Sequence, residues 1–245
     1  IIMSNLTIVK KIYRDEPQKG YENDKIVVWN QTKERYAHSK PPPDSIKLKV
    51  MAPEPFNNKK EQTIIRIVNR DMIDEAFDMK KKGMKPVVLN MADWQKAGGI
   101  VEAGSGAQEE ECFRRSNYFK TFTQDYHPFG ALDTVLSKDV EYYRKGFDSG
   151  YALMEQPVKL DMVAAPAVCM PVVSEDKKMF VNENDALLME YKIHMLVHTA
   201  VRNNNNILVL SAWGCGAFEC PVYHMAKIFK KVLAGYDGVF EEIVF

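Results

Sequence analysis

The sequence predicts an α/β fold in which helices cover both faces of a mixed β-sheet. The first observation is that short β-branched, apolar runs alternate with segments of helical apolar spacing from about residue 62 onward. The second is that glycine-containing loops follow two of the apolar runs, and each leads into a helical segment. Ligands of open α/β sheets bind beyond the carboxyl ends of strands, so these loops are also where we expect a binding site.

The regular part of the chain begins with a strand, a helix and a second strand. Residues 63–68 are β-branched and apolar, which is typical of a strand. Asp71 can cap the helix that follows, and Gly83 fits its end. Residues 86–92 form an apolar run that predicts a buried strand, and the glycine-rich loop over residues 97–106 comes next.

The rest of the chain continues this alternation. The predicted elements are a helix over 107–122 with Cys112, Phe113, Tyr118 and Phe119 on its apolar side, a strand over 160–165, an amphipathic helix over 186–201, a strand over 207–210, a helix over 221–233 and a final strand over 238–245.

Residues 1–60 differ from the remainder. Their segments are short and weakly patterned, and residues 40–58 carry five prolines. We therefore expect an N-terminal extension over residues 1–60 and a single α/β domain over residues 61–245. No apolar stretch reaches the roughly 18–20 residues of a membrane-spanning helix, and the start lacks the basic and apolar regions of a signal peptide, so neither is expected.

Composition narrows the class of protein. The chain of 245 residues has 33 basic and 33 acidic side chains, so its formal charge is zero, which argues against direct nucleic-acid binding. The four cysteines form no CxxC pair and do not resemble a disulfide framework. We expect reduced thiols in a cytoplasmic protein, or a nuclear one if the source is a eukaryote or a virus, and we expect a monomer.

Two loops are candidate binding sites for a phosphate group. In the first, Gly98 and Gly99 open a loop that ends at a helix N-terminus, where backbone amides and the helix dipole suit a diphosphate; the alternative is a flexible turn. In the second, Gly214 and Gly216 follow an apolar strand, and Phe218 either stacks on a sugar or base or belongs to the core.

An acidic run, Glu109 to Glu111, directly follows Gln108 at the predicted helix start. Acidic residues in a first turn are stabilised by the helix dipole, which is the structural alternative to a catalytic role. Adjacent helical residues point about 100° apart, so the three carboxylates cannot all face one ligand.

A metal site is not expected. His194 and His198 lie four residues apart on one predicted helix, but the glutamate of an HExxH motif is absent, so we expect a structural role for both. No cofactor is expected either.

Taken together, these segments resemble one family. Residues 89–92, the pair Gly98-Gly99 and the run Ala107-Gln108-Glu109-Glu110-Glu111-Cys112-Phe113-Arg114-Arg115-Ser116 are similar to the poly(ADP-ribose) glycohydrolase family, most of all to its microbial type, which has a macrodomain fold. The similarity continues at Tyr126-His127-Pro128, 163–166, 208–218 and 240–245. The ordered match covers about residues 62–245 and implies a macrodomain-like sheet.

One feature of the family signature is incomplete. The triple glycine aligns either with Gly98, Gly99 and Ile100 or with Ala97, Gly98 and Gly99, so one glycine is missing in both alignments. An isoleucine at this position would narrow the loop or block an amide beside the diphosphate.

The resemblance implies a role for each matching residue. Glu110 would be the catalytic acid/base, Glu109 would hold ribose hydroxyls, and Asn90 would bind the distal ribose. Gln108 would also bind substrate, Gly98 and Gly99 would lie beside the diphosphate, and Phe218 would lie on the distal ribose. The other side of the diphosphate would meet the backbone amides of Gly214, Cys215, Gly216 and Ala217.

The implied activity is hydrolysis of the ribose–ribose O-glycosidic bond of poly(ADP-ribose) chains on modified proteins, which releases ADP-ribose without a metal. A carboxylic acid would protonate the leaving hydroxyl, and the resulting carboxylate would activate water. Two alternatives stay open: a non-catalytic ADP-ribose reader, and a hydrolase of another ADP-ribosylated substrate.

Overall fold

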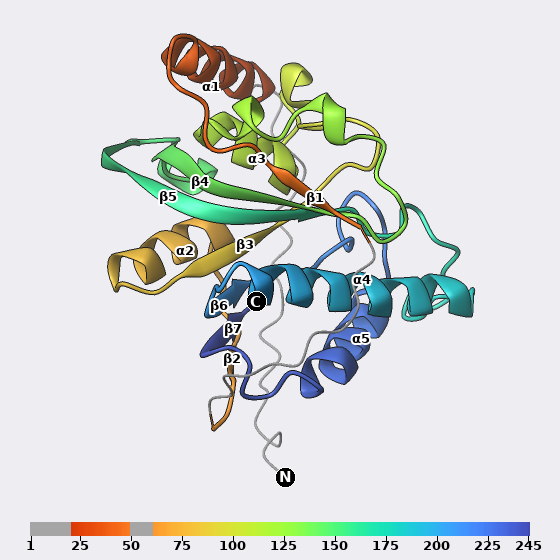
Figure 1. The fold of residues 1–245 in the computed structure, drawn as a ribbon. Coiled ribbons are helices and arrows are strands. Elements are labelled where there is room, and N and C mark those ends of the chain that lie inside the picture. Colours follow the sequence, from red (N-terminus) through yellow and green to blue (C-terminus); the bar gives the residue numbers. More distant parts are fainter. Residues whose placement is uncertain (1–20, 50–60) are drawn as a thin grey trace.

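A mixed β-sheet between two layers of helices forms the framework of the protein (Figure 1). The computed structural model describes residues 21–49 and 61–245. Within them, seven strands lie in the order β1-β4-β5-β3-β6-β7-β2. Their bounds are β1 Ile46–Leu48, β2 Ile64–Arg66, β3 Pro86–Met91, β4 Thr134–Arg144, β5 Leu153–Ala165, β6 Ile207–Val209 and β7 Glu242–Val244. The helices are α1 Tyr21–Tyr36, α2 Met72–Lys81, α3 Gln108–Arg115, α4 Glu183–Arg202 and α5 Val222–Ala234.

The central strand β3 decides where a site can form. It pairs in parallel with β5 on one side and β6 on the other, whereas β4 is antiparallel to both β5 and β1. The carboxyl ends of β5, β3 and β6 therefore meet at one edge of the sheet. The loops after these three strands include both glycine-containing loops.

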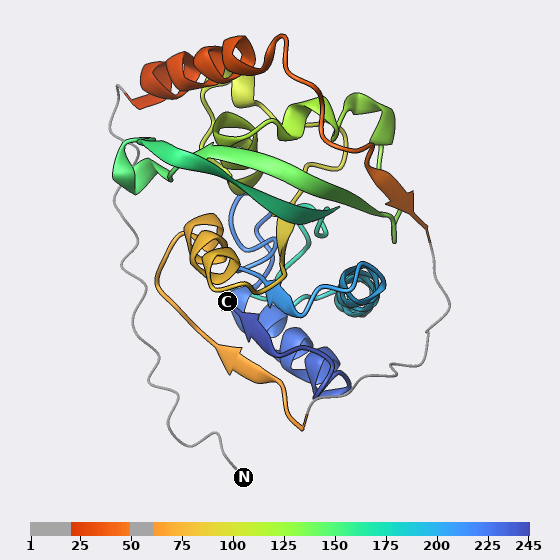
Figure 2. The ribbon, with the colours of Figure 1, turned by 60° about the vertical axis from the view of Figure 1, so that its left-hand side comes forward.

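Alternation along β3 separates two hydrophobic cores. Val87 and Leu89 pack with residues of α4 and α5, which lie side by side (Figure 2). Val88 points to the opposite face and packs with residues of α1, α2 and α3. Because side chains alternate along a strand, Asn90 also points to the α3 face.

The start of α2 matches the sequence prediction. The carboxylate of Asp71 accepts a hydrogen bond from the backbone N–H of Asp74 at 2.8 Å, which caps the helix. Gly83 follows the last turn with φ +80°, a conformation that favours glycine.

The helix predicted over 107–122 is shorter than expected. Helix α3 ends at Arg115, and Ser116 is extended and bridges to Tyr142 of β4. The Ser116 hydroxyl donates to the carbonyl of Cys112 at 2.6 Å and accepts from the N–H of Tyr118 at 3.1 Å. This hydroxyl therefore satisfies backbone groups that a longer helix would use.

The sheet extends further on one side than the sequence predicted. Strand β4 was not expected, and β5 begins seven residues before the predicted start at residue 160. The pairing of β4 with β5 shifts register between Ser137 and Val140, where Asp139 has φ +53°. A bulge of this kind interrupts the two-residue alternation by which a strand is recognised. The last strand, β7, is by contrast shorter than the strand predicted over residues 238–245.

The part of residues 1–60 that the structure describes packs on the sheet and its helices. The 16-residue helix α1 contacts α3, although only short, weakly patterned segments were expected there. Strand β1 pairs with β4 in the same sheet, with Ile46 opposite Leu136. The boundary predicted near residue 60 lies outside the described residues, so the division at that point stays a prediction.

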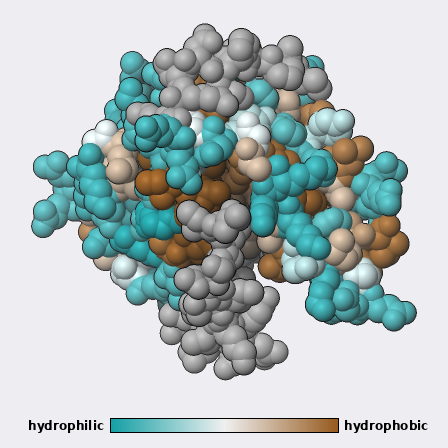
Figure 3. Space-filling view, turned by 90° about the horizontal axis from the view of Figure 1, so that it is seen from below, coloured by the Kyte–Doolittle hydropathy of each residue, from teal (hydrophilic) through white to brown (hydrophobic). Residues whose placement is uncertain are grey.

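Apolar surface is found at the β2 edge of the sheet. Strand β2 and the residue after it leave Ile64, Ile65 and Ile67 exposed. Figure 3 views the molecule from the side on which Figure 1 draws β2, and hydrophobic residues gather near the middle of that face. No helix among the described residues is long and apolar enough to cross a membrane.

We expect Asp71→Ala to destabilise the protein by about 1–3 kcal/mol, because it removes a helix cap and one of two carboxylates that pair with the buried Arg115. Urea unfolding would measure the loss. Asp71→Asn keeps the cap acceptor and should lose less, so equal losses in the two variants would contradict the capping role.

Candidate active site

Glu109 lies at the centre of the candidate site, in the first turn of α3. One carboxylate oxygen, Oε2, accepts a hydrogen bond from the N–H of Asp93 at 2.6 Å. The other, Oε1, accepts from the N–H of Gly98 at 3.2 Å and lies 3.5 Å from Nδ2 of Asn90. Only 2% of the residue is exposed. The carboxylate therefore joins the loop after β3 to the start of α3.

Burial changes the acidity of this carboxyl group. Desolvation raises the pKa of Glu109 to about 8, although the amides of Asp93 and Gly98 favour the charged form. The neighbouring Glu110 adds to the upward shift. Glu109 can therefore hold a proton near neutral pH.

Asn90 is fully buried beside Glu109. Its Nδ2 lies 3.4 Å from the hydroxyl of Tyr118, and its Oδ1 is buried without a hydrogen-bond partner among the described residues. A buried acceptor of this kind is costly unless something donates to it.

The turn at Gly98 and Gly99 requires glycine. Both residues have positive φ, +73° and +53°. A Cβ on Gly98 would lie 2.5 Å from the ring of Phe113, and one on Gly99 would lie 2.5 Å from Oε1 of Glu110. The absent side chains thus let the loop lie directly against α3.

Glu110 is held differently from Glu109. Its Oε1 accepts from the N–H of Ile100 at 3.2 Å, and Oε2 has no hydrogen-bond donor among the described residues. Ile100 is 57% exposed. The residue in place of a third glycine therefore directs its amide to Glu110.

Glu111 and the preceding Gln108 are turned elsewhere, as the 100° spacing predicted for the acidic run. Oε1 of Glu111 accepts from Arg114 at 2.8 Å and from the hydroxyl of Tyr151 at 2.7 Å. The amide of Gln108 bonds the backbone of β3 through both ends: Nε2 donates to the carbonyl of Leu89, and Oε1 accepts from the N–H of Met91, each at 2.9 Å. Gln108 therefore fixes α3 on β3.

The second loop lies over the end of β5. Trp213 is fully buried, and its indole N–H donates to the carbonyl of Ala165 at 3.2 Å. Gly214 has φ +76°, and a Cβ there would lie 2.6 Å from Cβ of Ala167 and 2.8 Å from Sγ of Cys220. Close packing therefore requires the first glycine of this loop.

Beyond Gly214 the second loop is more open. Gly216 and Ala217 are exposed, and their backbone N–H groups donate to no acceptor within the part of the chain that the structure describes. The ring of Phe218 is half-buried against the core of α4 and α5, so the core role weighed for it is confirmed in part. The thiol of Cys215 donates to the carbonyl of Trp213 at 3.5 Å.

The loops after β3 and β5 also approach each other. Met91 of β3 pairs with Ala165 of β5. Beyond these strand ends, partial burial and the nearby carboxylate of Asp93 raise the pKa of Cys169. Val88 of β3 pairs in parallel with Val209 of β6, so strand pairing also brings both predicted loops to one edge of the sheet.

The two histidines share one partner. Nδ1 of His194 lies 2.5 Å from the hydroxyl of Tyr236, and Nε2 of His198 lies 3.2 Å from the same oxygen. These contacts fit the structural role predicted for both. Over residues 21–49 and 61–245, no three His, Cys, Asp or Glu side chains gather as a metal site would require.

Two residues at the site were not predicted from the sequence. Asp93 donates its N–H to Glu109, and its carboxylate accepts from the N–H groups of Gln95 and Lys96 at 2.7 and 2.9 Å. An aspartate that begins a turn is a local signal for this arrangement. Tyr118 has no such signal, because it reaches Asn90 across 28 positions in the chain.

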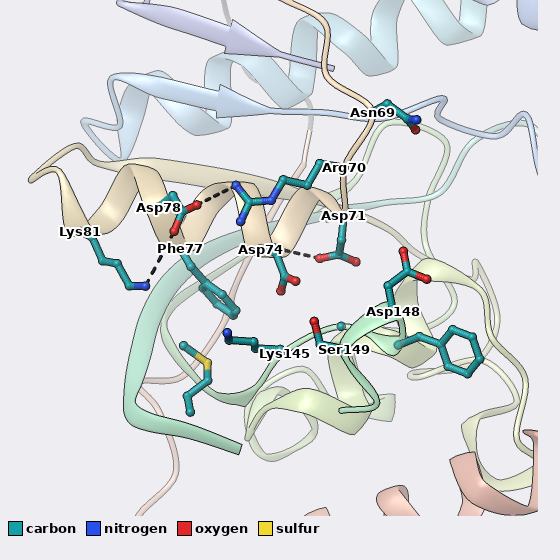
Figure 4. Close-up of a pocket in the computed structure, with 13 residues that line it drawn as sticks. Asn69, Arg70, Asp71, Asp74, Phe77, Asp78, Lys81, Lys145, Asp148 and Ser149 are labelled. Atoms are coloured by element: carbon teal, nitrogen blue, oxygen red, sulfur yellow. Dashed lines mark hydrogen bonds and ion pairs between the residues drawn. The ribbon is translucent and has the colours of Figure 1, made fainter. Parts of the chain in front are cut away.

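A separate cavity of about 420 Å³ lies at the start of α2 (Figure 4). None of the predicted site residues lines it. Arg70 pairs with Asp78 at 2.6 Å, and Lys81 lies 3.7 Å from the same carboxylate. Arg70, Asp78 and Lys81 of this cavity thus form one charged cluster.

One of the comparisons with known proteins identifies a family. The model of the family "Microbial-type PARG, catalytic domain" matches residues 10–144. No curated protein matches the chain. The structure of poly(ADP-ribose) glycohydrolase from Thermomonospora curvata is similar, with a TM-score of 0.74, 19% identity, and 91% of this chain and 93% of that chain covered.

A second similar structure is the poly(ADP-ribose) glycohydrolase from Deinococcus radiodurans in complex with ADP-ribose. Its TM-score is 0.64 at 21% identity, with 91% of this chain and 82% of that chain covered. These likenesses place the chain in the same fold, which is the α/β architecture that the sequence predicted.

We expect Gly98→Ala to destabilise the protein by about 2–4 kcal/mol, because the residue has φ +73° and its Cβ would meet the buried Phe113 ring. Denaturant unfolding would measure this. Gly216→Ala is the matched control, since no heavy atom lies within 4 Å of a Cβ there. A control as unstable as Gly98→Ala would contradict the packing argument.

We expect the stability of the folded protein to fall as pH rises from about 4.5 to about 8, because folded Glu109 holds its proton more tightly than unfolded Glu109. The contribution is complete below this window and lost above it. Unfolding of Glu109→Gln across the same pH range should lack this fall; parallel curves for the two proteins would refute the assignment.

Proposed function

The chain belongs to the microbial-type poly(ADP-ribose) glycohydrolase (PARG) family, and from this premise we propose how its residues release ADP-ribose from poly(ADP-ribose). The activity is hydrolysis of the ribose–ribose O-glycosidic bond. The observation that carries the residue assignment is the contrast between two neighbouring carboxylates. Glu109 is bonded through both oxygens, whereas Oε2 of Glu110 has no donor among the described residues.

Glu110 is the proton donor and acceptor in this proposal. Its carboxylic acid gives a proton to the leaving ribose oxygen as the bond from that oxygen to the anomeric carbon breaks. The anomeric carbon then carries positive charge. The Glu110 carboxylate takes a proton from water, and the water oxygen forms the new bond to that carbon. The Ile100 amide keeps Oε1 fixed and leaves Oε2 to exchange the proton.

Glu109 and Asn90 supply the contacts to the ribose. Glu109 is already held in place by Asp93 and Gly98, so its orientation costs nothing further when substrate binds. The unpartnered Oδ1 of Asn90 would accept from a ribose hydroxyl, which satisfies a buried polar atom.

Backbone amides hold the diphosphate. The exposed N–H groups of Gly216 and Ala217 have no acceptor among the described residues, and amides of this kind bind anions. Gly98 and Gly99 would border the other side of the diphosphate without donating to it, because their N–H groups bond Glu109 and the carbonyl of Lys96. Gly214 and Cys215 would complete the second loop, and Phe218 would cover the distal ribose. Gln108 acts through β3 instead of touching substrate.

The D. radiodurans protein binds ADP-ribose, and this supports ADP-ribose as the ligand here. Poly(ADP-ribose) chains on modified proteins are the proposed substrate. A monomer in the cytoplasm, with no cofactor, remains our prediction.

We expect Glu110→Gln to bind ADP-ribose but to release it from poly(ADP-ribose) about 10²–10⁴-fold more slowly, because an amide cannot exchange the proton. Product release by chromatography and binding by calorimetry would measure both properties. Glu155→Gln is the matched control, since Glu155 is exposed near the start of β5, at the opposite end of that strand from the site.

Three outcomes separate the hypotheses. Loss of turnover in Glu110→Gln alone supports the assignment. Binding without release by the wild type would instead indicate an ADP-ribose reader or a hydrolase of another ADP-ribosylated substrate. Absence of both would contradict ADP-ribose as the ligand.

A further inference from the structure

We propose that helix α1 is a working part of the active site, and that Trp29 is a positioning residue for the turn at Gly98 and for the Glu109 carboxylate. This proposal rests on the proposed function. Helix α1 lies outside the predicted domain over 61–245, and nothing in the sequence assigned it a role. In Figure 1 it lies beside α3, the helix that carries both carboxylates.

Trp29 reaches the glycine turn through one aromatic ring. It is 4% exposed, and its ring centroid lies 6.2 Å from that of Phe113. The Phe113 ring fills the space that a Cβ on Gly98 would need, at 2.5 Å. The N–H of Gly98 in turn donates to Glu109 at 3.2 Å. The indole therefore packs against the same ring against which the turn is packed.

A second path leads from the same ring to the same carboxylate. The ring centroids of Phe113 and Tyr118 lie 5.5 Å apart, and the hydroxyl of Tyr118 lies 3.4 Å from Nδ2 of Asn90. That nitrogen lies 3.5 Å from Oε1 of Glu109. Both paths start at Phe113, so displacement of this ring would disturb two partners of Glu109 together.

Other side chains of α1 attach the helix to the same elements. The hydroxyl of the fully buried Thr32 lies 2.7 Å from the hydroxyl of Tyr143 and also bonds the carbonyl of Arg114, in the last turn of α3. Lys33 pairs with Glu102 at 2.9 Å, within the glycine-rich loop. Helix α1 therefore contacts the loop and the helix between which the site forms.

The physical argument is close packing. Protein interiors leave little free volume, so removing an indole leaves a cavity into which the neighbouring ring can move. The turn at Gly98 has a left-handed conformation that depends on its surroundings. A ring that moves away from Gly98 removes part of those surroundings, and a small displacement of a catalytic group costs much of the rate.

Tyr36 provides a matched control on the same helix. It is 3% exposed, and its ring contacts go to Phe119 and Tyr143. Its hydroxyl donates to Glu141 of β4 at 3.1 Å. Tyr36→Ala therefore removes a large buried ring from α1 without removing support from Phe113.

The experiment compares Trp29→Ala, Trp29→Phe and Tyr36→Ala with the wild type in the full chain. Hydrogen exchange over residues 97–106 measures opening of the loop, calorimetry measures ADP-ribose affinity, and release of ADP-ribose from poly(ADP-ribose) gives kcat and KM. Melting temperatures compare how far Trp29→Ala and Tyr36→Ala are destabilised. Trp29→Phe covers the case in which the alanine variant does not fold.

We expect Trp29→Ala to increase exchange over 97–106 and to lower kcat by about 10–100-fold, with a partial recovery in Trp29→Phe and near-normal values in Tyr36→Ala. Equal effects of Trp29→Ala and Tyr36→Ala, or unchanged exchange in the Trp29 variants, would overturn the proposal. A wild type that releases no ADP-ribose refutes the proposed function instead, and exchange with ADP-ribose affinity then decides the role of Trp29.

Discussion

The carboxylate of Glu109 accepts hydrogen bonds from two backbone amides, those of Asp93 and Gly98, which lie at separate points of the loop after β3. A loop of this kind loses conformational entropy when it is ordered, and a buried carboxylate is costly without donors. Here the carboxylate holds the loop in one conformation, and the loop amides supply the donors that the carboxylate needs. The bonds of Gln108 to the backbone of β3 hold α3 in the position from which Glu109 reaches both amides.

Two adjacent glutamates consequently differ in what they can do. Glu109 is fixed through both oxygens, which suits an oriented contact, while Glu110 is fixed through one oxygen only. The helix period creates this difference, because neighbouring side chains in one turn meet different surroundings. A site that needs both an oriented contact and an exchangeable proton can therefore be built from consecutive residues at one helix start.

Local signals in the sequence predicted much of the fold and the site. Asp71 at a helix start, the apolar run of β3 and the acidic first turn of α3 each depend on neighbours within a few residues. What was missed depends on distant partners. The end of α3 is set by the hydroxyl of Ser116 and its bridge to Tyr142, and α1 is held by Phe113 and Tyr143, which come much later in the chain.

The two arginines at the end of α3 have a consequence for the site at its start. Both are fully buried, and they reach in different directions, Arg114 to Glu111 and the carbonyl of Ser105, and Arg115 to Asp71 and Asp74. Anchors on two sides prevent a short helix from turning about its own axis. The directions in which Glu109 and Glu110 point from the helix axis are therefore set by contacts one to two turns further along α3. These contacts hold the helix in one rotational orientation.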